Sequence, residues 1–297
     1  MLKIAISGHL GFVGSATVKL LEKEGHEVIG YDLMEGKDIR DYAQLEQFVM
    51  EHKPDRFLHL AAIARFAEAD RDPKLAYETN VYGTANVAAV CKKHKIPLVY
   101  SSTGSVYMPI KNTPPIKEDW PVQGNSVYGC SKAIGEKYVQ ECNPYIILRY
   151  AHLYGAEKKM HGLIGGYWDR IKRGLAPRLY GGKQSNDFTY IPDVAMANYK
   201  ALIAPWNSWN QAYNVGTGEE LTAEEAGNIV CELTGYKGAV EKLEGREVDP
   251  ERFAFDCTKA EQMIDFKAKY KFREGLKEMF DTLENKNIKD ESIVNQG

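Results

Sequence analysis

The sequence predicts an α/β fold: a doubly wound parallel sheet of the Rossmann type with a smaller C-terminal lobe. Two observations support this prediction. Apolar runs of strand length alternate with longer amphipathic segments over the first 150 residues, and a glycine-rich segment joins the first run to the first amphipathic segment. Alternation of this kind produces right-handed βαβ crossovers, which place helices on both faces of a parallel sheet.

The expected elements follow in chain order. The expected strands are 2–7, 27–31, 56–60, 96–101 and 145–149, with a further short strand at Asp38-Ile39. The expected helices are 12–24, 41–52, 73–94 and 126–142, then shorter ones near 163–173, 192–203 and 222–234. Glycine and proline break the alternation after about residue 150, and the polar tail after Glu284 is expected to fray. We therefore expect a nucleotide-binding domain over 1–150 and a substrate-binding lobe over 151–297, with a segment near 214–218 returning to the main sheet.

Composition argues against several classes of protein. Hydrophobic residues make up 44% and charged residues 27% of the 297 residues, which is typical of a globular protein. Lys and Arg total 38 against 41 Asp and Glu, so the net charge of −3 does not favour nucleic acid or an anionic membrane as partner. The first apolar run begins at Leu2 and none approaches about 18 residues, so neither an export signal nor a membrane span is expected. The five cysteines are scattered, which favours a reduced, metal-free cytoplasmic protein.

The segment Ser7-Gly8-His9-Leu10-Gly11-Phe12-Val13-Gly14 follows the first expected strand and opens the first expected helix. Its glycines form a GxxGxxG pattern. Glycine permits a tight turn and a close approach of the backbone, and the free N–H groups at a helix start bind anions. A glycine triplet alone is also typical of an ordinary turn. The strand before it and the helix after it favour a dinucleotide site that includes Gly8, Gly11, Phe12, Val13 and Gly14.

Three further segments fit the same site. Asp32 follows the second expected strand, where a carboxylate accepts hydrogen bonds from both ribose hydroxyls and repels a 2′-phosphate. The sequence therefore predicts NAD rather than NADP, although a strand-end carboxylate in solvent is the alternative. Asp38-Ile39 is expected to contact adenine. The small residues of Leu60-Ala61-Ala62 would let the backbone pass close to the cofactor, or would serve helix packing.

Tyr128 and Lys132, in the segment YGCSK, are four residues apart and share one face of the expected helix 126–142. The pairs Tyr107–Lys111 and Tyr154–Lys158 have the same spacing, but a proline or glycine close after each of these tyrosines interrupts a helix. Context therefore favours the first pair.

A phenol has a reference pKa of about 10 and needs help to act as a base. The charge of Lys132 would stabilise the Tyr128 phenolate. Thr103 ends a strand-like run at the carboxyl edge of the expected sheet, where its hydroxyl can hydrogen-bond the reacting oxygen. The three side chains together predict an acid–base centre.

The order of these motifs resembles the extended short-chain dehydrogenase/reductase family and, within it, the sugar-nucleotide epimerases and dehydratases. The resemblance spans about residues 2 to 275 and adds HLAA at 59–62, NVYGT around Asn80, SST at 101–103 and LRY at 148–150. It implies that Thr103, Tyr128 and Lys132 are catalytic, and that Asn80 and Ser101 belong to the cofactor site. It also implies a homodimer formed through two helices per subunit, here 73–94 and 126–142.

The C-terminal lobe resembles the same family with two departures. Leu179-Tyr180-Gly181-Gly182 is similar to the stretch that brackets the nucleotide, and Arg246 stands where the family has a pyrophosphate-binding arginine. His152 and Asn186 stand where an asparagine and an arginine are usual. The resemblance implies Thr103, His152, Tyr180 and Arg246 as substrate-binding residues, with an ordinary packed or surface role as the alternative for His152 and Arg246.

These features predict NAD-dependent epimerisation of a nucleotide-activated sugar, at C4 through a transient keto-sugar. In the similar 4,6-dehydratases an acidic pair follows the threonine, and relatives that epimerise at C3 and C5 have a cysteine two positions after it. Gly104 and Ser105 stand at these positions here. Two alternatives stay open: a net oxidoreductase of the same family, of the reductase or dehydratase type, and a non-catalytic NAD-sensing regulator, which the intact catalytic residues disfavour.

Overall fold

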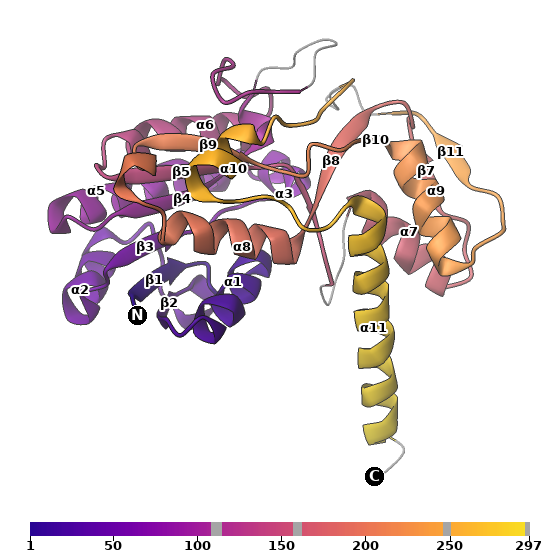
Figure 1. Ribbon diagram of the computed structural model, residues 1–297, viewed down its shortest axis with the longest axis horizontal. Helices are drawn as coiled ribbons and strands as arrows, with labels where there is room; N and C mark the ends of the chain where they lie inside the picture. The colour runs from indigo at the N-terminus through magenta and orange to yellow at the C-terminus, as the bar shows by residue number, and fades with distance from the viewer. Residues whose placement is uncertain (108–114, 157–161, 246–250, 295–297) are drawn as a thin grey trace.

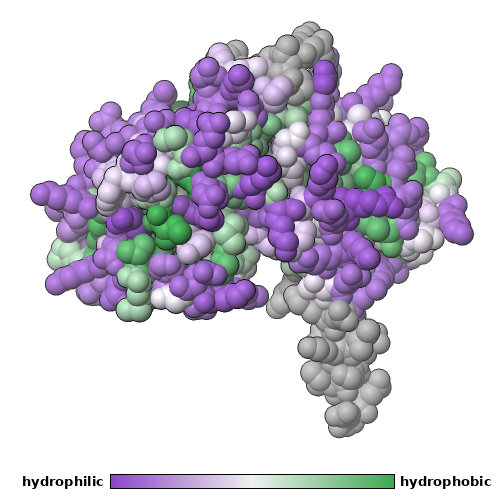
Figure 2. Space-filling model, viewed as in Figure 1, coloured by the Kyte–Doolittle hydropathy of each residue, from purple (hydrophilic) through white to green (hydrophobic). Residues whose placement is uncertain are grey.

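The computed structural model describes residues 1–107, 115–156, 162–245 and 251–294, of which 285–294 are described by their backbone alone. Figure 1 shows a main body on one side, a smaller lobe on the other, and a long terminal helix beside the smaller lobe. Hydrophilic side chains cover most of the face seen in Figure 2. Within the described ranges, no helix combines the length and the hydropathy that crossing a bilayer requires.

The main body is built on a sheet of six parallel strands. Their order across the sheet is β2 (Glu27–Tyr31), β1 (Lys3–Ser7), β3 (Arg56–His59), β4 (Leu98–Thr103), β5 (Tyr145–Tyr150) and β9 (Gln211–Val215). The order reverses direction at β1 and β3, and ligands of such sheets bind beyond the carboxyl ends of the strands at this point. The predicted doubly wound parallel sheet is confirmed, and its sixth strand comes from beyond residue 150.

Alternate side chains of the strands enter two separate cores. Ile4, Leu58 and Leu148 pack with helices α1 (Phe12–Lys23) and α8 (Ile191–Leu202), which lie against each other on one face. Ala5 and Phe57 point the other way, toward α2 (Tyr42–His52), α5 (Thr84–His94) and α6 (Val127–Gln140). Both faces of the sheet are therefore covered, as a parallel sheet requires.

Two local expectations are wrong. The expected helix 73–94 is divided into α4 (Pro73–Tyr77), a π-helical segment η2 (Glu78–Gly83) and α5. Asp38-Ile39 forms no strand, because the Tyr31 hydroxyl and the Gln44 side chain bind the backbone of Asp38 in place of a neighbouring strand. Tyr31 and Gln44 lie outside the segment, so the local sequence of Asp38-Ile39 does not predict this conformation.

The smaller lobe contains two short sheets and two helices. A three-stranded sheet has the order β10 (Glu220–Thr222), β8 (Ser185–Tyr190) and β6 (His152–Tyr154), and β11 (Glu241–Leu243) pairs with β7 (Arg178–Tyr180). Helices α7 (Gly162–Lys172) and α9 (Ala223–Thr234) pack together beside these strands. The remaining elements are α3 (Phe66–Arg71), α10 (Thr258–Ile264) and α11 (Phe272–Val294), with short 3₁₀ turns η1 (Leu33–Glu35), η3 (Gly104–Val106) and η4 (Trp206–Ser208).

Helix α11 overturns the expectation of a frayed tail after Glu284, because it continues to Val294. It is anchored at its start, where Phe272, Leu276 and Met279 are buried in the core of the smaller lobe. This packing starts a helix that the polar pattern of the tail does not predict.

Candidate active site

A cleft of about 2050 Å³ runs along the carboxyl ends of the parallel strands and continues between the two lobes. Residues from α1, β2, β4, α6 and the loops that follow β1 and β3 line one part, and residues from α7, β7 and β8 line the other. Typical small-molecule sites measure about 300–1,000 Å³. The cleft therefore has room for a dinucleotide and a second ligand together.

The glycine-rich segment forms a cradle in which backbone packs on backbone. Gly8 has a φ of +75°, and a Cβ there would lie 2.7 Å from the main-chain nitrogen of Ala61. A Cβ on Gly14 would lie 2.1 Å from the carbonyl oxygen of Gly8. A larger residue at Gly8 would push the loop away from the segment that follows β3. A larger residue at Gly14 would push α1 away from the loop. The main chain of Leu60 and Ala61 packs against Gly8, and Leu60, Ala61 and Ala62 line the cleft.

Helix α1 points its N-terminus at this cradle. Its N-cap residue Gly11 offers no side-chain hydrogen bond to the first turn, and Phe12, Val13 and Gly14 line the cleft. Uncapped N–H groups together with the helix dipole favour a phosphate group. The residues present thus fit the pyrophosphate of a dinucleotide.

Asp32 lies at the end of β2 and lines the cleft. Its Oδ2 accepts a hydrogen bond from the N–H of Leu10 at 3.1 Å, and its Oδ1 accepts one from the N–H of Met34 at 3.0 Å. These bonds hold the carboxylate between the glycine-rich loop and η1. Each carboxylate oxygen keeps a further lone pair for a ribose hydroxyl. Asp38 and Ile39 line the cleft farther along the same side.

Tyr128 lies in the first turn of α6 and faces the cleft. The Ser126 side chain caps the helix by accepting from the N–H of Gly129 at 3.1 Å. Gly129 allows α6 to press on the turn after Thr103, since a Cβ there would lie 2.3 Å from the carbonyl oxygen of Ser105. Burial raises the pKa of Tyr128 to about 12, and a hydrogen bond with the Thr103 side chain opposes that rise. The structure therefore brings Thr103 and Tyr128 together.

Lys132 lies one turn farther along α6 and is only 2% exposed. Its Nζ lies 4.2 Å from the centre of the Tyr100 ring, a cation–π contact. Burial lowers the pKa of Lys132 to about 7, and the Glu136 carboxylate, one further turn along the helix, opposes this decrease. Lys132 is thus buried one turn beyond Tyr128, and it does not line the cleft.

The hydroxyls of the other two tyrosines with this spacing, Tyr107 and Tyr154, make hydrogen bonds within the fold. The Tyr107 hydroxyl donates to Asn214 Oδ1 at 2.6 Å and accepts from Arg149 at 2.9 Å. The Tyr154 hydroxyl donates to the carbonyl of Phe272 at 3.2 Å. Neither tyrosine lies in a helix, and the lysines four residues after them fall outside the described residues. Only Tyr128 combines a helical partner lysine with a neighbouring Thr103.

Asn80 holds the loop that borders the site. Its side-chain oxygen accepts from the N–H of Ile63 at 2.8 Å, while its Nδ2 donates to the Ile63 carbonyl and to Ser131 Oγ, both at 3.0 Å. The loop leads into α3, whose Phe66 lies edge-on to Tyr128 with ring centres 5.4 Å apart. Asn80 is therefore a structural link between η2, this loop and α6. Sequence reasoning missed Phe66, because its sequence neighbours carry no sign of the contact.

A buried ion pair lies beside Thr103 and Lys132. Arg149 donates to Glu136 through Nε at 3.0 Å and through NH2 at 2.8 Å, and the two residues are 4% and 1% exposed. The Ser102 hydroxyl donates to the same carboxylate at 2.5 Å. The pair joins α6, β4 and β5 immediately beside Thr103 and Lys132. Two features of the sequence point to this pair: the i, i+4 spacing from Lys132 to Glu136, and the arginine of the LRY segment, Arg149.

The remaining predicted residues are placed as follows. The Ser101 hydroxyl donates to the carbonyl of His59 at 3.0 Å, and Ser101 does not line the cleft. His152, Tyr180 and Asn186 line the part of the cleft formed by the smaller lobe. Arg246 falls outside the described residues.

Comparison with known proteins identifies the family. Residues 4–216 match the model of the NAD dependent epimerase/dehydratase family. The chain belongs to this family. A putative UDP-glucose 4-epimerase of Methanocaldococcus jannaschii is 30% identical, with 96% of this chain and 99% of the relative covered. A UDP-glucose 4-epimerase of Mycolicibacterium smegmatis is 28% identical over 96% of this chain and 99% of its own length.

Solved structures agree with these relatives. The UDP-glucose 4-epimerase of Thermotoga maritima with UDP-glucose has a TM-score of 0.88 and 27% identity, covering 96% of this chain and 99% of that one. The Thermus thermophilus UDP-glucose 4-epimerase in complex with NAD has a TM-score of 0.84 and 29% identity, covering 94% and 98%. The predicted cofactor NAD and the predicted epimerisation of a nucleotide-activated sugar are confirmed at the level of the family and its relatives.

Glu136→Gln should destabilise the protein by about 3 kcal/mol or more, because it leaves the Arg149 guanidinium buried without a countercharge. Urea unfolding of the purified protein measures the change. Replacing both partners by methionine should recover most of the lost stability, since no charge is then buried. Glu68→Gln, which breaks an exposed ion pair with Arg65, should change stability by less than about 1 kcal/mol. Equal effects of the two single substitutions would contradict this assignment.

Lys132→Met should stabilise the cofactor-free protein at pH 7, and the advantage should shrink as the pH rises toward 10. The folded state lowers the pKa of Lys132 to about 7, so between that pH and its ordinary pKa the unfolded chain binds more protons. The stability of the original protein relative to the variant therefore rises with pH in this window. Urea unfolding of both proteins at pH 7, 8.5 and 10 measures how the difference in stability changes with pH. A difference that stays constant would contradict the lowered pKa of Lys132.

Proposed function

We propose that this protein is a UDP-hexose 4-epimerase that retains NAD as a tightly bound cofactor. The observation that supports this most directly is the contact of Thr103 with Tyr128 in the cleft, followed by Gly104 and Ser105 in place of a second acid–base pair. This equipment suffices for oxidation and re-reduction at one carbon. UDP is inferred from the relatives, because UDP-glucose 4-epimerases match almost the whole chain.

In the proposed mechanism Tyr128 takes the proton of the substrate 4-hydroxyl. Its pKa of about 12 in the cofactor-free protein means that the phenolate needs stabilisation, which the nearby Lys132 ammonium and the Thr103 hydroxyl supply. NAD, when bound along the cleft, would supply a reversible acceptor for the C4 hydride. Tyr128 then gives its proton back to the substrate oxygen, so neither cofactor nor protein changes over a full cycle.

The remaining roles follow from position along the cleft. Gly8, Gly11, Phe12, Val13 and Gly14 hold the pyrophosphate. Asp32 accepts from the ribose, Asp38-Ile39 borders adenine, and Leu60-Ala61-Ala62 lies against the cofactor, with Asn80 fixing the loop that follows. Ser101 supports this site from β4 through its hydrogen bond to the carbonyl of His59, without lining the cleft. His152 and Tyr180 contact the nucleotide-sugar from the smaller lobe. Arg246 is proposed as a pyrophosphate ligand from the sequence alone.

The proposed division assigns residues 1–150 to NAD and 151–297 to substrate, and the protein forms a homodimer in the cytoplasm. Three large side chains on neighbouring η2 and α6 are exposed: Tyr82 (64%), Ile134 (41%) and Tyr138 (42%). A second copy would cover these apolar groups. The five cysteines are free thiols, as is usual in a reducing compartment.

A net dehydratase is the second candidate, because a dTDP-glucose 4,6-dehydratase from Bacillus anthracis in complex with NAD has a TM-score of 0.85 and 25% identity. The deciding experiment incubates the protein with UDP-, GDP- and dTDP-hexoses without added reductant and follows products by NMR. We expect UDP-glucose and UDP-galactose to interconvert. A 4-keto-6-deoxy product, or stoichiometric consumption of added NAD(P)H, would instead support net dehydration or reduction.

Tyr128→Phe should lower kcat by about a hundredfold to ten-thousandfold while NAD remains bound, since the ring stays and the titrating oxygen is removed. Turnover is measured by the NMR assay and NAD content by absorbance after denaturation. Tyr107→Phe and Tyr154→Phe are the matched controls, and each should change kcat much less. A larger loss in either control would show that the wrong tyrosine had been chosen.

Asp32 should make the protein prefer NAD over NADP, because its carboxylate repels a 2′-phosphate. Calorimetric titration of both cofactors at equal ionic strength measures the preference. Asp32→Asn should reduce it, since the repulsive charge is gone. Equal affinities of the original protein for NAD and NADP would reject this role.

A further inference from the structure

We propose that Arg40 is a positioning residue for the adenine end of the cofactor site. In this proposal Arg40 orients the Asp38 carboxylate so that it accepts a hydrogen bond from the 6-amino group of adenine. The proposal rests on the placement of Asp38-Ile39 beside adenine in the proposed function, and it adds the residue that makes this placement selective.

Arg40 grips the Asp38 carboxylate from one side. Its Nε donates to Oδ1 at 3.1 Å and to Oδ2 at 2.9 Å, and its NH2 donates to Oδ2 at 2.6 Å. The main-chain N–H of Arg40 also donates to Oδ1, at 2.9 Å. Four hydrogen bonds from a single residue fix the plane of the carboxylate. They also lower the pKa of Asp38, which keeps it ionised as an acceptor.

Arg40 is itself braced by the π-helical segment and by α5. Its NH1 lies 3.7 Å from Glu78 Oε2. Asn86 Nδ2 donates to the main-chain carbonyls of Ile39 at 3.1 Å and of Arg40 at 3.0 Å. A Cβ on Gly83 would lie 2.6 Å from Ile39 Cδ1, so the segment around Ile39 packs closely against η2. Both the guanidinium and its backbone are therefore held in place.

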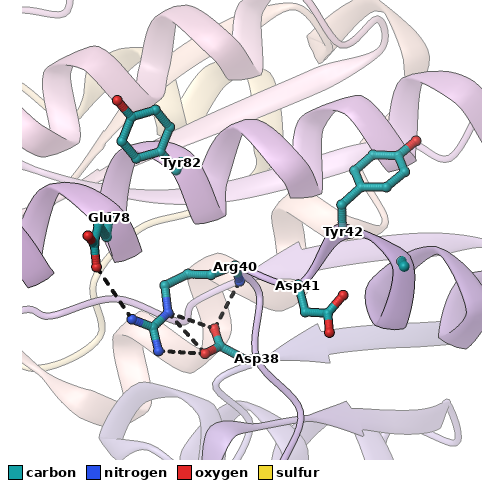
Figure 3. Close-up of a pocket in the computed structure, with 7 residues that line it drawn as sticks. Asp38, Arg40, Asp41, Tyr42, Glu78 and Tyr82 are labelled. Carbon is teal, nitrogen blue, oxygen red and sulfur yellow. Dashed lines mark hydrogen bonds and ion pairs between the residues drawn. The ribbon is translucent and has the colours of Figure 1, made fainter.

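Arg40 forms a wall between two cavities. It lines the cofactor cleft together with Asp38, and both residues also line a shallow outer depression of about 780 Å³. Figure 3 shows the guanidinium between Asp38 and Glu78, with the Tyr42 and Tyr82 hydroxyls directed away from it. Three N–H donors of Arg40 make these four contacts, because the Nε–H is shared between the two oxygens, so about one of the four acceptor positions of the Asp38 carboxylate stays open for the adenine amino group.

The chemistry predicts which cofactor is preferred. Adenine presents an amino donor at position 6, whereas hypoxanthine presents a carbonyl oxygen that a carboxylate repels. A fixed carboxylate should therefore discriminate NAD from nicotinamide hypoxanthine dinucleotide. A carboxylate that is free to rotate into solvent would avoid the repulsion and lose the hydrogen bond, so its discrimination would be small.

The test is calorimetric titration of the full chain, stripped of bound nucleotide, with each of these two dinucleotides. We expect the original protein to prefer NAD by about tenfold or more, the usual effect of a hydrogen bond to a charged group. Arg40→Met should reduce the preference to less than about threefold, and Arg40→Lys should give an intermediate value because it keeps the charge but loses the planar fork.

Lys74→Met is the matched control, because Lys74 is the other cation beside Glu78, at 3.8 Å, and it does not line the cleft. It should keep the full preference. If Asp38→Asn abolishes the preference while both Arg40 variants retain it, Arg40 is not a positioning residue, although the adenine site stands. If Asp38→Asn also retains the preference, the placement of Asp38 in the proposed function is wrong and the role of Arg40 is overturned with it.

Discussion

The buried ion pair between Glu136 and Arg149 is the constraint on which the candidate active site depends. It joins α6, which carries Tyr128 and Lys132, to β5, and through the Ser102 hydroxyl it reaches β4 immediately before Thr103. Two charges removed from water stay favourable only when their hydrogen bonds are complete, so the geometry has little freedom. The helix and the two strands are therefore held in fixed positions relative to one another. The positions of Thr103 and Tyr128 at the cleft are fixed with them.

The second constraint is close approach of backbone at glycine. Gly8 lies against Ala61, Gly14 against Gly8, and Gly129 against Ser105, each at a distance that excludes a Cβ. Gly8, Gly14 and Ser105 all line the cleft, so these close contacts shape its wall. Glycine is required there because the contact is with main chain, which cannot move aside as a flexible side chain can.

The substrate part of the cleft is built differently. Strand β9 and helix α8 come from the C-terminal half, yet they complete the main sheet and its core, so the two halves of the chain are not independent bodies. The departures His152 and Asn186 lie in the smaller lobe. Both departures are therefore separate from Thr103 on β4 and from Tyr128 and Lys132 on α6.

The sequence by itself determined the strands and helices of the main sheet, the glycine-rich turn, Asp32 and the helical pair Tyr128 and Lys132, because each is encoded by the spacing of near neighbours. Tertiary structure decided what local spacing could not. The hydroxyls of Tyr107 and Tyr154 donate hydrogen bonds to Asn214 and to the carbonyl of Phe272. The backbone of Asp38 binds the Tyr31 hydroxyl instead of a neighbouring strand. Glu136 pairs with Arg149. In each case the partner lies in another element, and only the packing of the sheet brings the two together.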